Sequence, residues 1–239
     1  MYESHAGFHV PADEAAAFQE QDRLRSAVEA HGPLPRPLRY VAGLDVAYAT
    51  DESRVAGAVV VLDLRTLEVV DSATAKRPVE FPYIPGLLAY REIPALLDAL
   101  ARLTVVPEIL VCDGYGLAHP RRFGLACHLG VLTGIPTFGV AKTPFIGSFQ
   151  EPGRERGAVS DLLAPPAAPG EPDEIIGRVL RTQSGIKPVF ISVGHRIGLD
   201  EATGLTLRLA PSSPGFRLPE TTRRSDQLSR QALAEADKQ

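Results

Sequence analysis

Cysteine is scarce in this chain, whose 239 residues include only Cys112 and Cys127. Two cysteines form neither a disulfide framework nor a zinc-binding spacing, which favours the reducing cytosol. No apolar run approaches membrane-spanning length, and the acidic N-terminus lacks the apolar centre of a signal peptide. A phosphate-binding glycine loop ending in Lys-Ser or Lys-Thr is also missing, which disfavours an NTPase. We therefore expect a soluble cytoplasmic protein.

A strong excess of one charge is missing as well, because 25 basic residues face 29 acidic ones, for a net charge of −4. Bulk charge therefore does not indicate a nucleic-acid-binding protein, although a local basic face can coexist with acidic helices elsewhere. The length and the apolar content of 44% predict a globular protein with a large core. We expect one domain over residues 1–239, with loose ends at residues 1–11 and about 230–239.

The order of apolar segments predicts an α/β fold with a mixed sheet. An antiparallel meander of three strands comes first. Two parallel strands separated by a helix follow, then a surface excursion over residues 147–174, rich in glycine, proline and alanine, and then a strand pair. The predicted strands cover residues 39–48, 55–64, 67–76, 108–113, 135–142, 175–182 and 188–193. The predicted helices cover residues 15–30, 87–103 and 123–133, with two more beginning near residues 200 and 220.

One segment near the middle of the chain combines a buried strand with polar chemistry. Its apolar run, too short for a helix, delivers Asp113 to the carboxyl end of a strand, where α/β sheets place ligands. Gly114 follows at once, and His119, Arg121 and Arg122 come shortly after. An Asp-Gly pair alone more often caps a turn, and an arginine pair alone is more often a solvated face. The gathering of all these groups within ten residues favours a functional site.

Two further carboxylates interrupt apolar patterns. Asp45 lies near the middle of the first predicted strand, where a lone buried carboxylate is costly unless a partner or a metal lies beside it. Glu92 lies in the first half of a strongly apolar helix, where the simpler interpretation is an exposed helix acid. The strand at 135–142 is expected to deliver Lys142 to the sheet edge that carries Asp113.

Three carboxylates brought together on one sheet suit metal-assisted phosphodiester hydrolysis. Hard cations such as Mg²⁺ take oxygen ligands from one or two carboxylates, and water and substrate phosphate fill the remaining positions. The metal makes a hydroxide nucleophile and stabilises charge on the phosphate oxygens. His195, which ends the last predicted strand pair, can orient the attacking water or protonate the leaving oxygen. Zinc is less suitable, because the candidate ligands are mainly oxygen donors.

Two prolines stiffen the loop formed by Pro82, Tyr83, Ile84, Pro85 and Gly86. One interpretation is a rigid connector whose aromatic side chain packs into the core. The other is a wedge, since large apolar side chains on rigid loops can insert into a base stack. The local pattern does not decide between the two.

Six motifs in this chain closely resemble those of the endonuclease V family, which repairs DNA containing deaminated adenine. The resemblance runs from about the first helix to Arg223 and covers nearly the whole chain. Several motifs in the right order are far more specific than any one of them alone. The motifs are Gly43-Leu44-Asp45-Val46, Pro82-Tyr83-Ile84-Pro85-Gly86, Arg91-Glu92-Ile93-Pro94-Ala95-Leu96, Asp113-Gly114-Tyr115-Gly116-Leu117-Ala118-His119-Pro120-Arg121-Arg122, Gly139-Val140-Ala141-Lys142 and Gly194-His195-Arg196.

The resemblance implies an RNase H-like fold and a deoxyinosine 3′-endonuclease. Such an enzyme hydrolyses the second phosphodiester bond 3′ to deoxyinosine and leaves 3′-hydroxyl and 5′-phosphate ends. The resemblance assigns Mg²⁺, for which Mn²⁺ can substitute, to Asp45 and Asp113. The other catalytic residues that it implies are Glu92, Lys142 and His195. The residues that it implies for DNA and lesion recognition are Tyr83 as the wedge, Ile84, Pro85, Gly86, Gly114, His119, Arg121 and Arg122.

The expected partner is DNA containing deoxyinosine, without a membrane and without an obligate protein partner. Two alternatives stay open, namely an endonuclease for inosine in RNA and a catalytically silent nucleic-acid-binding protein on the same sheet. The presence of all the carboxylates and of His195 argues against the silent protein. Tyr115 departs from the family pattern, in which histidine is more usual between the two glycines, so the range of lesions is not fixed by the resemblance.

Overall fold

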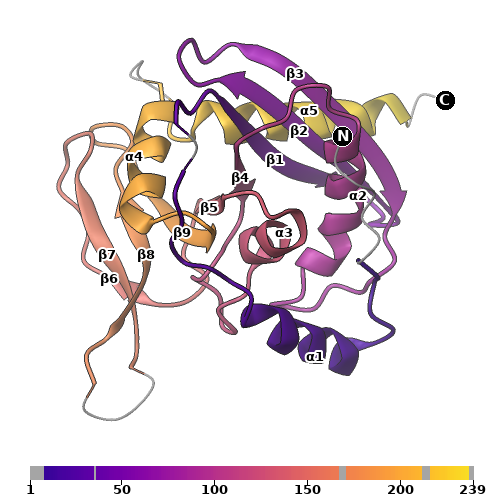
Figure 1. The fold of residues 1–239 in the computed structure, drawn as a ribbon, viewed down its shortest axis with the longest axis horizontal. Helices are drawn as coiled ribbons and strands as arrows, with labels where there is room; N and C mark the ends of the chain where they lie inside the picture. The colour runs from indigo at the N-terminus through magenta and orange to yellow at the C-terminus, as the bar shows by residue number, and fades with distance from the viewer. Residues whose placement is uncertain (1–7, 35, 167–170, 212–215, 237–239) are drawn as a thin grey trace.

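The computed structural model describes residues 8–34, 36–166, 171–211 and 216–236. Its strands form one mixed sheet of nine strands in the order β3-β2-β1-β4-β5-β9-β8-β7-β6, shown in Figure 1. The strands are β1 (Tyr40–Tyr48), β2 (Arg54–Asp63), β3 (Val69–Pro78), β4 (Ile109–Asp113), β5 (Thr137–Ala141), β6 (Ser148–Phe149), β7 (Val159–Ala164), β8 (Glu174–Leu180) and β9 (Val189–His195). The helices are α1 (Glu14–Arg25), α2 (Ala89–Ala101), α3 (Leu125–Thr133), α4 (Leu199–Leu209) and α5 (Glu220–Ala236).

The predicted meander and the predicted parallel strands are both confirmed. β1, β2 and β3 pair in antiparallel fashion, while β4 pairs in parallel with β1 on one side and with β5 on the other. β5 then pairs with β9 in antiparallel fashion, so β9 runs in the direction opposite to β4 and β5. The last residue of β9 therefore lies where β4 and β5 begin, which is the opposite edge of the sheet from the one at which these two strands end. This direction decides which predicted site residues meet.

Helices cover both faces of the central strands, which explains why these strands are almost continuously apolar. On one face, residues such as Leu44 and Leu110 pack against Leu96 of α2 and Leu129 of α3. On the other face, neighbouring residues of the same strands, such as Val41 and Ile109, pack with α4 and α5. Figure 1 shows α5 lying across β1 and β2. The two cores hold the carboxyl end of β4 between them as a rigid platform.

The helix α5 lies unusually close to the sheet. A Cβ atom added to Gly43 of β1 would lie 2.3 Å from the carbonyl oxygen of Thr221. Only glycine fits such an approach, and the facing residues of α5 are accordingly small and buried, namely Thr221, Thr222, Ser225 and Ser229. The contact brings α5 next to Asp45, two residues beyond Gly43.

The structure differs from the sequence-based expectations in three places. The predicted surface excursion at 147–174 contains two strands, β6 and β7, which extend the sheet beyond β8, although residues 167–170 lie outside the described part. The chain at 230–236, expected to be loose, continues α5. The first helix ends at Arg25 rather than near Ala30. The strands within 147–174 form because pairing with β8 overrides the low strand propensity of this glycine- and proline-rich segment.

No helix in the described ranges is long and apolar enough to cross a lipid bilayer. Of the expected loose lead-in at 1–11, residues 1–7 lie outside the described part of the chain.

Candidate active site

Asp45 and Asp113 lie side by side on neighbouring parallel strands. The register pairs Leu44 of β1 with Cys112 of β4, so the next residue of each strand is a carboxylate on the same face. Burial, and after it the negative charge of Asp113, raises the pKa of Asp45 to about 7. Removing a carboxylate from water disfavours its ionised form, and a second carboxylate nearby disfavours it further. The fold therefore concentrates negative charge that the strands themselves do not compensate.

Glu92 joins this pair from α2, and it is not the exposed helix acid of the simpler interpretation. Its side chain is buried, with 6% of the residue exposed. Burial, and after it the charge of Asp45, raises the pKa of Glu92 to about 8. The hydroxyl group of Tyr48, at the end of β1, donates a hydrogen bond of 3.3 Å to Glu92 Oε1. Glu92 and Asp45 thus act on each other electrostatically across the gap between α2 and the sheet.

Lys142 supplies positive charge to the same cluster, as the predicted strand positions require. It directly follows β5, and its Nζ atom lies 2.8 Å from Asp113 Oδ2. Burial alone would lower the pKa of Lys142, but the hydrogen bond and charge of Asp113 outweigh it, and the charges of Asp45 and Asp226 add to the effect. The pKa is therefore raised, and the ammonium group is the positive charge that these carboxylates share.

Asp226 is a fourth carboxylate near this cluster, and the sequence motifs do not point to it. It lies on α5, and its charge also raises the pKa of Asp45 and that of Lys142. Its Oδ1 atom accepts hydrogen bonds of 3.1 and 2.9 Å from Nε and Nη2 of Arg230, one turn further along the helix. A signal was available in the stripe of small residues 221, 225 and 229, which marks the face of α5 that approaches the sheet beside Asp226.

The four carboxylates have the donor chemistry that divalent cations of the Mg²⁺ type prefer. The raised pKa values of Asp45 and Glu92 also indicate a site that a bound cation would stabilise, because the cation would favour the ionised carboxylates. Among the residues that the structure describes, no three His, Cys, Asp or Glu side chains already stand close enough together to hold a metal ion. The side chains of Asp45 and Asp113, which lie nearest to each other in the register, are the best candidates for ligands.

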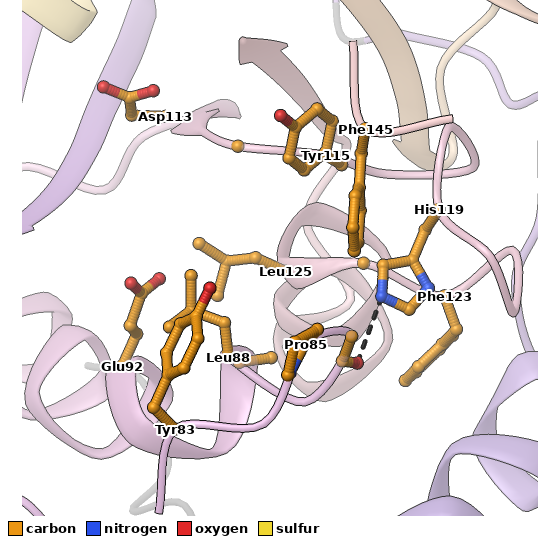
Figure 2. A pocket seen from close by; sticks show the side chains of 14 residues that line it. Tyr83, Pro85, Leu88, Glu92, Asp113, Tyr115, His119, Phe123, Leu125 and Phe145 are labelled. Atoms are coloured by element: carbon orange, nitrogen blue, oxygen red, sulfur yellow. Dashed lines mark hydrogen bonds between the residues drawn. The ribbon is translucent and has the colours of Figure 1, made fainter. Parts of the chain in front are cut away.

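A pocket of about 240 Å³ opens beside the carboxylates, as Figure 2 shows. Glu92 and Asp113 belong to its lining, so the pocket and the carboxylate cluster form one site. The remaining lining is mostly apolar or aromatic and comes from the loop at 83–89, the segment after β4 and the loop after β5. These residues are Tyr83, Pro85, Gly86, Leu88, Ala89, Gly114, Tyr115, His119, Phe123, Gly124, Leu125 and Phe145. Such a lining suits a flat, uncharged ring.

The two large side chains of the proline-bracketed loop have different environments. Ile84 packs against the buried cluster that contains Leu87 and Tyr90, whereas the connector interpretation would bury the aromatic Tyr83 instead. Tyr83 is 64% exposed at the rim of the pocket, as the wedge interpretation requires. The guanidinium carbon of Arg91 lies 5.8 Å from the centre of the Tyr83 ring, which is the distance of a cation–π contact. The loop therefore anchors one side chain and presents the other.

His119 fixes the same loop from the side of β4. Its Nδ1 atom accepts a hydrogen bond from the Arg121 amide at 3.2 Å, so Nε2 carries the proton and donates to the Gly86 carbonyl at 3.1 Å, the dashed line in Figure 2. Burial lowers the pKa of His119 to about 4, although the bond to Gly86 opposes this. His119 is therefore a neutral side chain that links two walls of the pocket.

The two predicted arginines are engaged with carboxylates of the protein. Arg121 forms an ion pair with Asp22 of α1, and its guanidinium carbon lies 4.8 Å from the centre of the Phe18 ring. Arg122 donates hydrogen bonds of 2.9 and 2.6 Å to Glu174 of β8. Their charge is thus largely compensated, and in this structure they fasten α1 and β8 to the segment that follows β4.

His195 does not join the carboxylates. It pairs with Thr137 at the start of β5, whereas Asp113 pairs with Val140 near the end of that strand. The predicted meeting fails because β9 runs antiparallel to β5, so its last residue lies at the opposite edge of the sheet. His195 is 5% exposed, and its Nδ1 atom accepts a hydrogen bond of 3.2 Å from the Glu29 amide. Its surroundings are those of a structural side chain.

Comparisons with known proteins place this fold in a family. The family model described as Endonuclease V matches residues 22–227 of the chain. The chain belongs to the endonuclease V family. It is 55% identical to the endonuclease V of Streptomyces avermitilis over 231 residues, which cover 97% of this chain and 96% of that relative.

Solved endonuclease V structures share the fold over nearly the whole chain. The catalytic domain of human endonuclease V has a TM-score of 0.82 at 32% identity, covering 93% of this chain and 96% of that one. An endonuclease V from Ciona intestinalis, in complex with a 24mer DNA that contains an inosine followed by a ribo-adenosine, has a TM-score of 0.79 at 27% identity, covering 94% and 100%. The expected RNase H-like arrangement is thus confirmed, and the chain is a nuclease of a family that uses a divalent metal ion.

Proposed function

We propose that this endonuclease V repairs DNA containing deoxyinosine, hydrolysing the second phosphodiester bond 3′ to the lesion. Water adds to phosphorus, the bond from phosphorus to the 3′ oxygen breaks, and the products carry a 3′-hydroxyl group and a 5′-phosphate group. The observation that carries the proposal is the shared lining, because Glu92 and Asp113 border the same pocket as Tyr83 and Phe145. A base held in this pocket would place its own strand beside the carboxylates.

Mg²⁺ is the metal that we propose, with Asp45 and Asp113 as ligands and with Glu92 and Asp226 next to them. When bound, the ion would supply activation of water and neutralisation of charge on the phosphate. The residues around it have separate tasks. Glu92, once ionised, can orient or deprotonate the attacking water, while the Lys142 ammonium can leave Asp113 for a phosphate oxygen.

The pocket is proposed to hold hypoxanthine after the nucleotide has left the helix. Gly86 and Gly114 have φ angles of 87° and 146°, which glycine adopts readily, so their backbone can lie close to the base edge. Tyr83 at the rim would fill the space that the base leaves in the stack. Tyr115, which departs from the family pattern, donates a hydrogen bond of 3.0 Å to the Thr143 carbonyl, and its ring centre lies 5.3 Å from that of Phe145. It therefore shapes the wall of the pocket.

The proposal is tested by mapping the cut in end-labelled duplexes that carry one inosine at a known position, with and without Mg²⁺. The expected result is a Mg²⁺-dependent nick in DNA, one nucleotide beyond the lesion's own 3′ linkage. A matched RNA duplex distinguishes the endoribonuclease alternative, since faster cutting of RNA would change the substrate but keep the site. Binding of the inosine duplex without any nick would overturn the proposed activity and favour the catalytically silent protein.

A further inference from the structure

Gln21 of α1 is a buried amide that reaches two walls of the pocket without lining it. The residue is 1% exposed. Its Nε2 atom donates hydrogen bonds to the Gly86 carbonyl at 2.9 Å and to the Phe123 carbonyl at 3.3 Å. Gly86 and Phe123 lie 37 positions apart in the chain and both border the pocket. A single side chain from a third segment therefore ties the loop that carries Tyr83 to the turn before α3.

Chemistry fixes the orientation of this amide. Both partners are carbonyl oxygens, which only accept hydrogen bonds, so the nitrogen of Gln21 must face them. Its oxygen, Oε1, is buried and has no hydrogen-bond partner among the described residues. An unpaired buried acceptor is costly, and a leucine of similar size would avoid that cost. The amide is thus a poor choice for packing alone, which points to the two carbonyl contacts as its purpose.

The Gly86 carbonyl accepts a second hydrogen bond from His119, as described above. Gln21 and His119 together occupy both lone pairs of this oxygen, so it has no capacity left for a base. The peptide group after Gly86 is therefore held from two sides, at a residue whose φ of 87° few other residues tolerate. These two hydrogen bonds add to the core packing of Ile84 and Leu87, which holds the other side of the loop that presents Tyr83.

Other contacts of α1 make it a firm support for this amide. Asp22 pairs with Arg121, and the Ala17 carbonyl accepts a hydrogen bond of 2.9 Å from the hydroxyl group of Tyr90. The helix is thereby fastened both to the segment after β4 and to α2. Gln19, two residues before Gln21, points to solvent and provides a matched control on the same helix.

We propose that Gln21 is a positioning residue for lesion selectivity, which sets the spacing between the Gly86 wall and the Phe123 wall of the pocket. This inference rests on the proposed function, because it concerns the pocket that would receive hypoxanthine. Gln21 is not part of the pocket lining, and its hydrogen bonds go to backbone carbonyls and not to the carboxylates. Its loss should therefore affect the choice between inosine and normal DNA more than the chemical step.

The first test compares Gln21→Leu with Gln19→Leu in the full chain. Selectivity is measured as the ratio of Kd for an undamaged duplex to Kd for the inosine duplex, with Ca²⁺ in place of Mg²⁺ to prevent cutting. Gln21→Leu should lower this ratio roughly 3- to 10-fold, as the loss of one or two net hydrogen bonds predicts. The single-turnover rate on bound inosine duplex in Mg²⁺ should stay within about twofold of wild type, since about 0.4 kcal/mol corresponds to twofold. Gln19→Leu should leave both quantities unchanged.

The second test uses Gln21→Glu, which keeps the shape but carries a donor only when protonated. A carboxyl group buried against two carbonyl oxygens has a raised pKa, so the protonated form should gain population as pH falls. The selectivity of Gln21→Glu should therefore recover toward the wild-type ratio between about pH 8 and pH 5.5, while Gln19→Glu should follow wild type throughout.

The outcomes separate this inference from the proposed function. If wild type itself fails to prefer the inosine duplex, the proposed function falls. If wild type prefers it and Gln21→Leu retains the full ratio, the inference on Gln21 falls alone. Equal weakening of both duplexes, with no recovery of Gln21→Glu at low pH, would assign Gln21 to folding only and would also overturn the inference.

Discussion

Ionisable side chains lie beside glycines at two places in the central sheet. One is the carboxylate edge, where β4 and β5 end, and the other is the histidine edge, where these strands begin and β9 ends. The surroundings of the side chains differ between the two. At the edge where β4 ends, burial, and after it the charge of neighbouring carboxylates, raises the pKa values of Asp45 and Glu92. At the other edge, His195 is buried and accepts a hydrogen bond from the Glu29 amide. A Cβ atom added to Gly130 would lie 2.3 Å from the Cβ atom of His195, so this edge is tightly filled.

The two edges differ in how far neighbouring groups balance the charge of their ionisable side chains. The carboxylate edge holds more carboxylates than the ammonium group of Lys142 balances and opens onto a pocket, whereas the histidine edge holds a buried ring that accepts a hydrogen bond from the Glu29 amide. A polar residue at the end of a strand thus indicates function when its charge is left unbalanced beside a cavity. Where the charge is absent or satisfied, the same sequence pattern indicates packing.

The largest effect is expected at the carboxylate edge. Asp45→Asn keeps the shape of the side chain but removes the charge needed for a metal ligand, and it should lower the nicking rate at least ~100-fold. Binding of the inosine duplex should stay measurable, because the pocket and Tyr83 are untouched. Single-turnover nicking and gel-shift titration measure the two quantities. A variant that nicks at half the wild-type rate would remove Asp45 from the site.

Tyr83→Ala should have an intermediate effect that is confined to recognition. Loss of an aromatic side chain that stacks on bases weakens binding by about 1–3 kcal/mol. The preference for inosine duplex over undamaged duplex should therefore fall about 10-fold, whereas the melting temperature should hardly change, since Tyr83 is 64% exposed. Competition binding with both duplexes measures the preference. Unchanged discrimination would contradict the wedge role.

At the histidine edge, the expected effect is on stability. His195→Leu removes the buried acceptor for the Glu29 amide, and the free energy of unfolding should fall by about 1–3 kcal/mol. Chemical denaturation monitored by circular dichroism measures this change. An unchanged midpoint would show that the contact contributes little to the fold.

The pH dependence of stability in metal-free protein is the least direct test of the contrast. The folded-state pKa values of Asp45, about 7, and Glu92, about 8, lie above ordinary carboxyl values, so the folded chain retains protons that the unfolded chain has released. Stability should therefore fall as pH rises from about 4 to about 8. The melting temperature of wild type should fall relative to that of Asp45→Asn/Glu92→Gln as pH rises over this range. The expected shift is roughly 2–4 °C for each kcal/mol of change in the free energy of unfolding. Mg²⁺ should raise the wild-type melting temperature more at pH 8.5 than at pH 6.

Much of the fold was predictable from local pattern. The apolar runs of β1, β2, β4 and β5, together with the rule that parallel neighbours carry ligands at their carboxyl ends, bring Asp113 and Lys142 to one edge. Strands β6 and β7 were not predictable in this way, because their segment is rich in glycine and proline and depends on pairing with β8.

The positions of three residues near the site could not be predicted, because each depends on how distant segments pack together and not on the local sequence. Asp226 lies on a polar helix over 100 residues from Asp113, and only the close approach of α5 to Gly43 brings it near Asp45. His195 follows an apolar strand just as Asp113 does, but the direction of β9 sends it to the other edge. Gln21 looks like any polar residue of an amphipathic helix until its two carbonyl partners are seen.

The central claim is that catalysis belongs to the carboxylate edge and not to the histidine edge. The most direct test measures single-turnover nicking of one inosine duplex by Asp113→Asn and His195→Gln, side by side, with saturating enzyme at a temperature where both variants are folded. We predict a loss of at least ~100-fold for Asp113→Asn and a rate within about twofold of wild type for His195→Gln. A comparable loss in both variants, with His195→Gln fully folded, would contradict the claim.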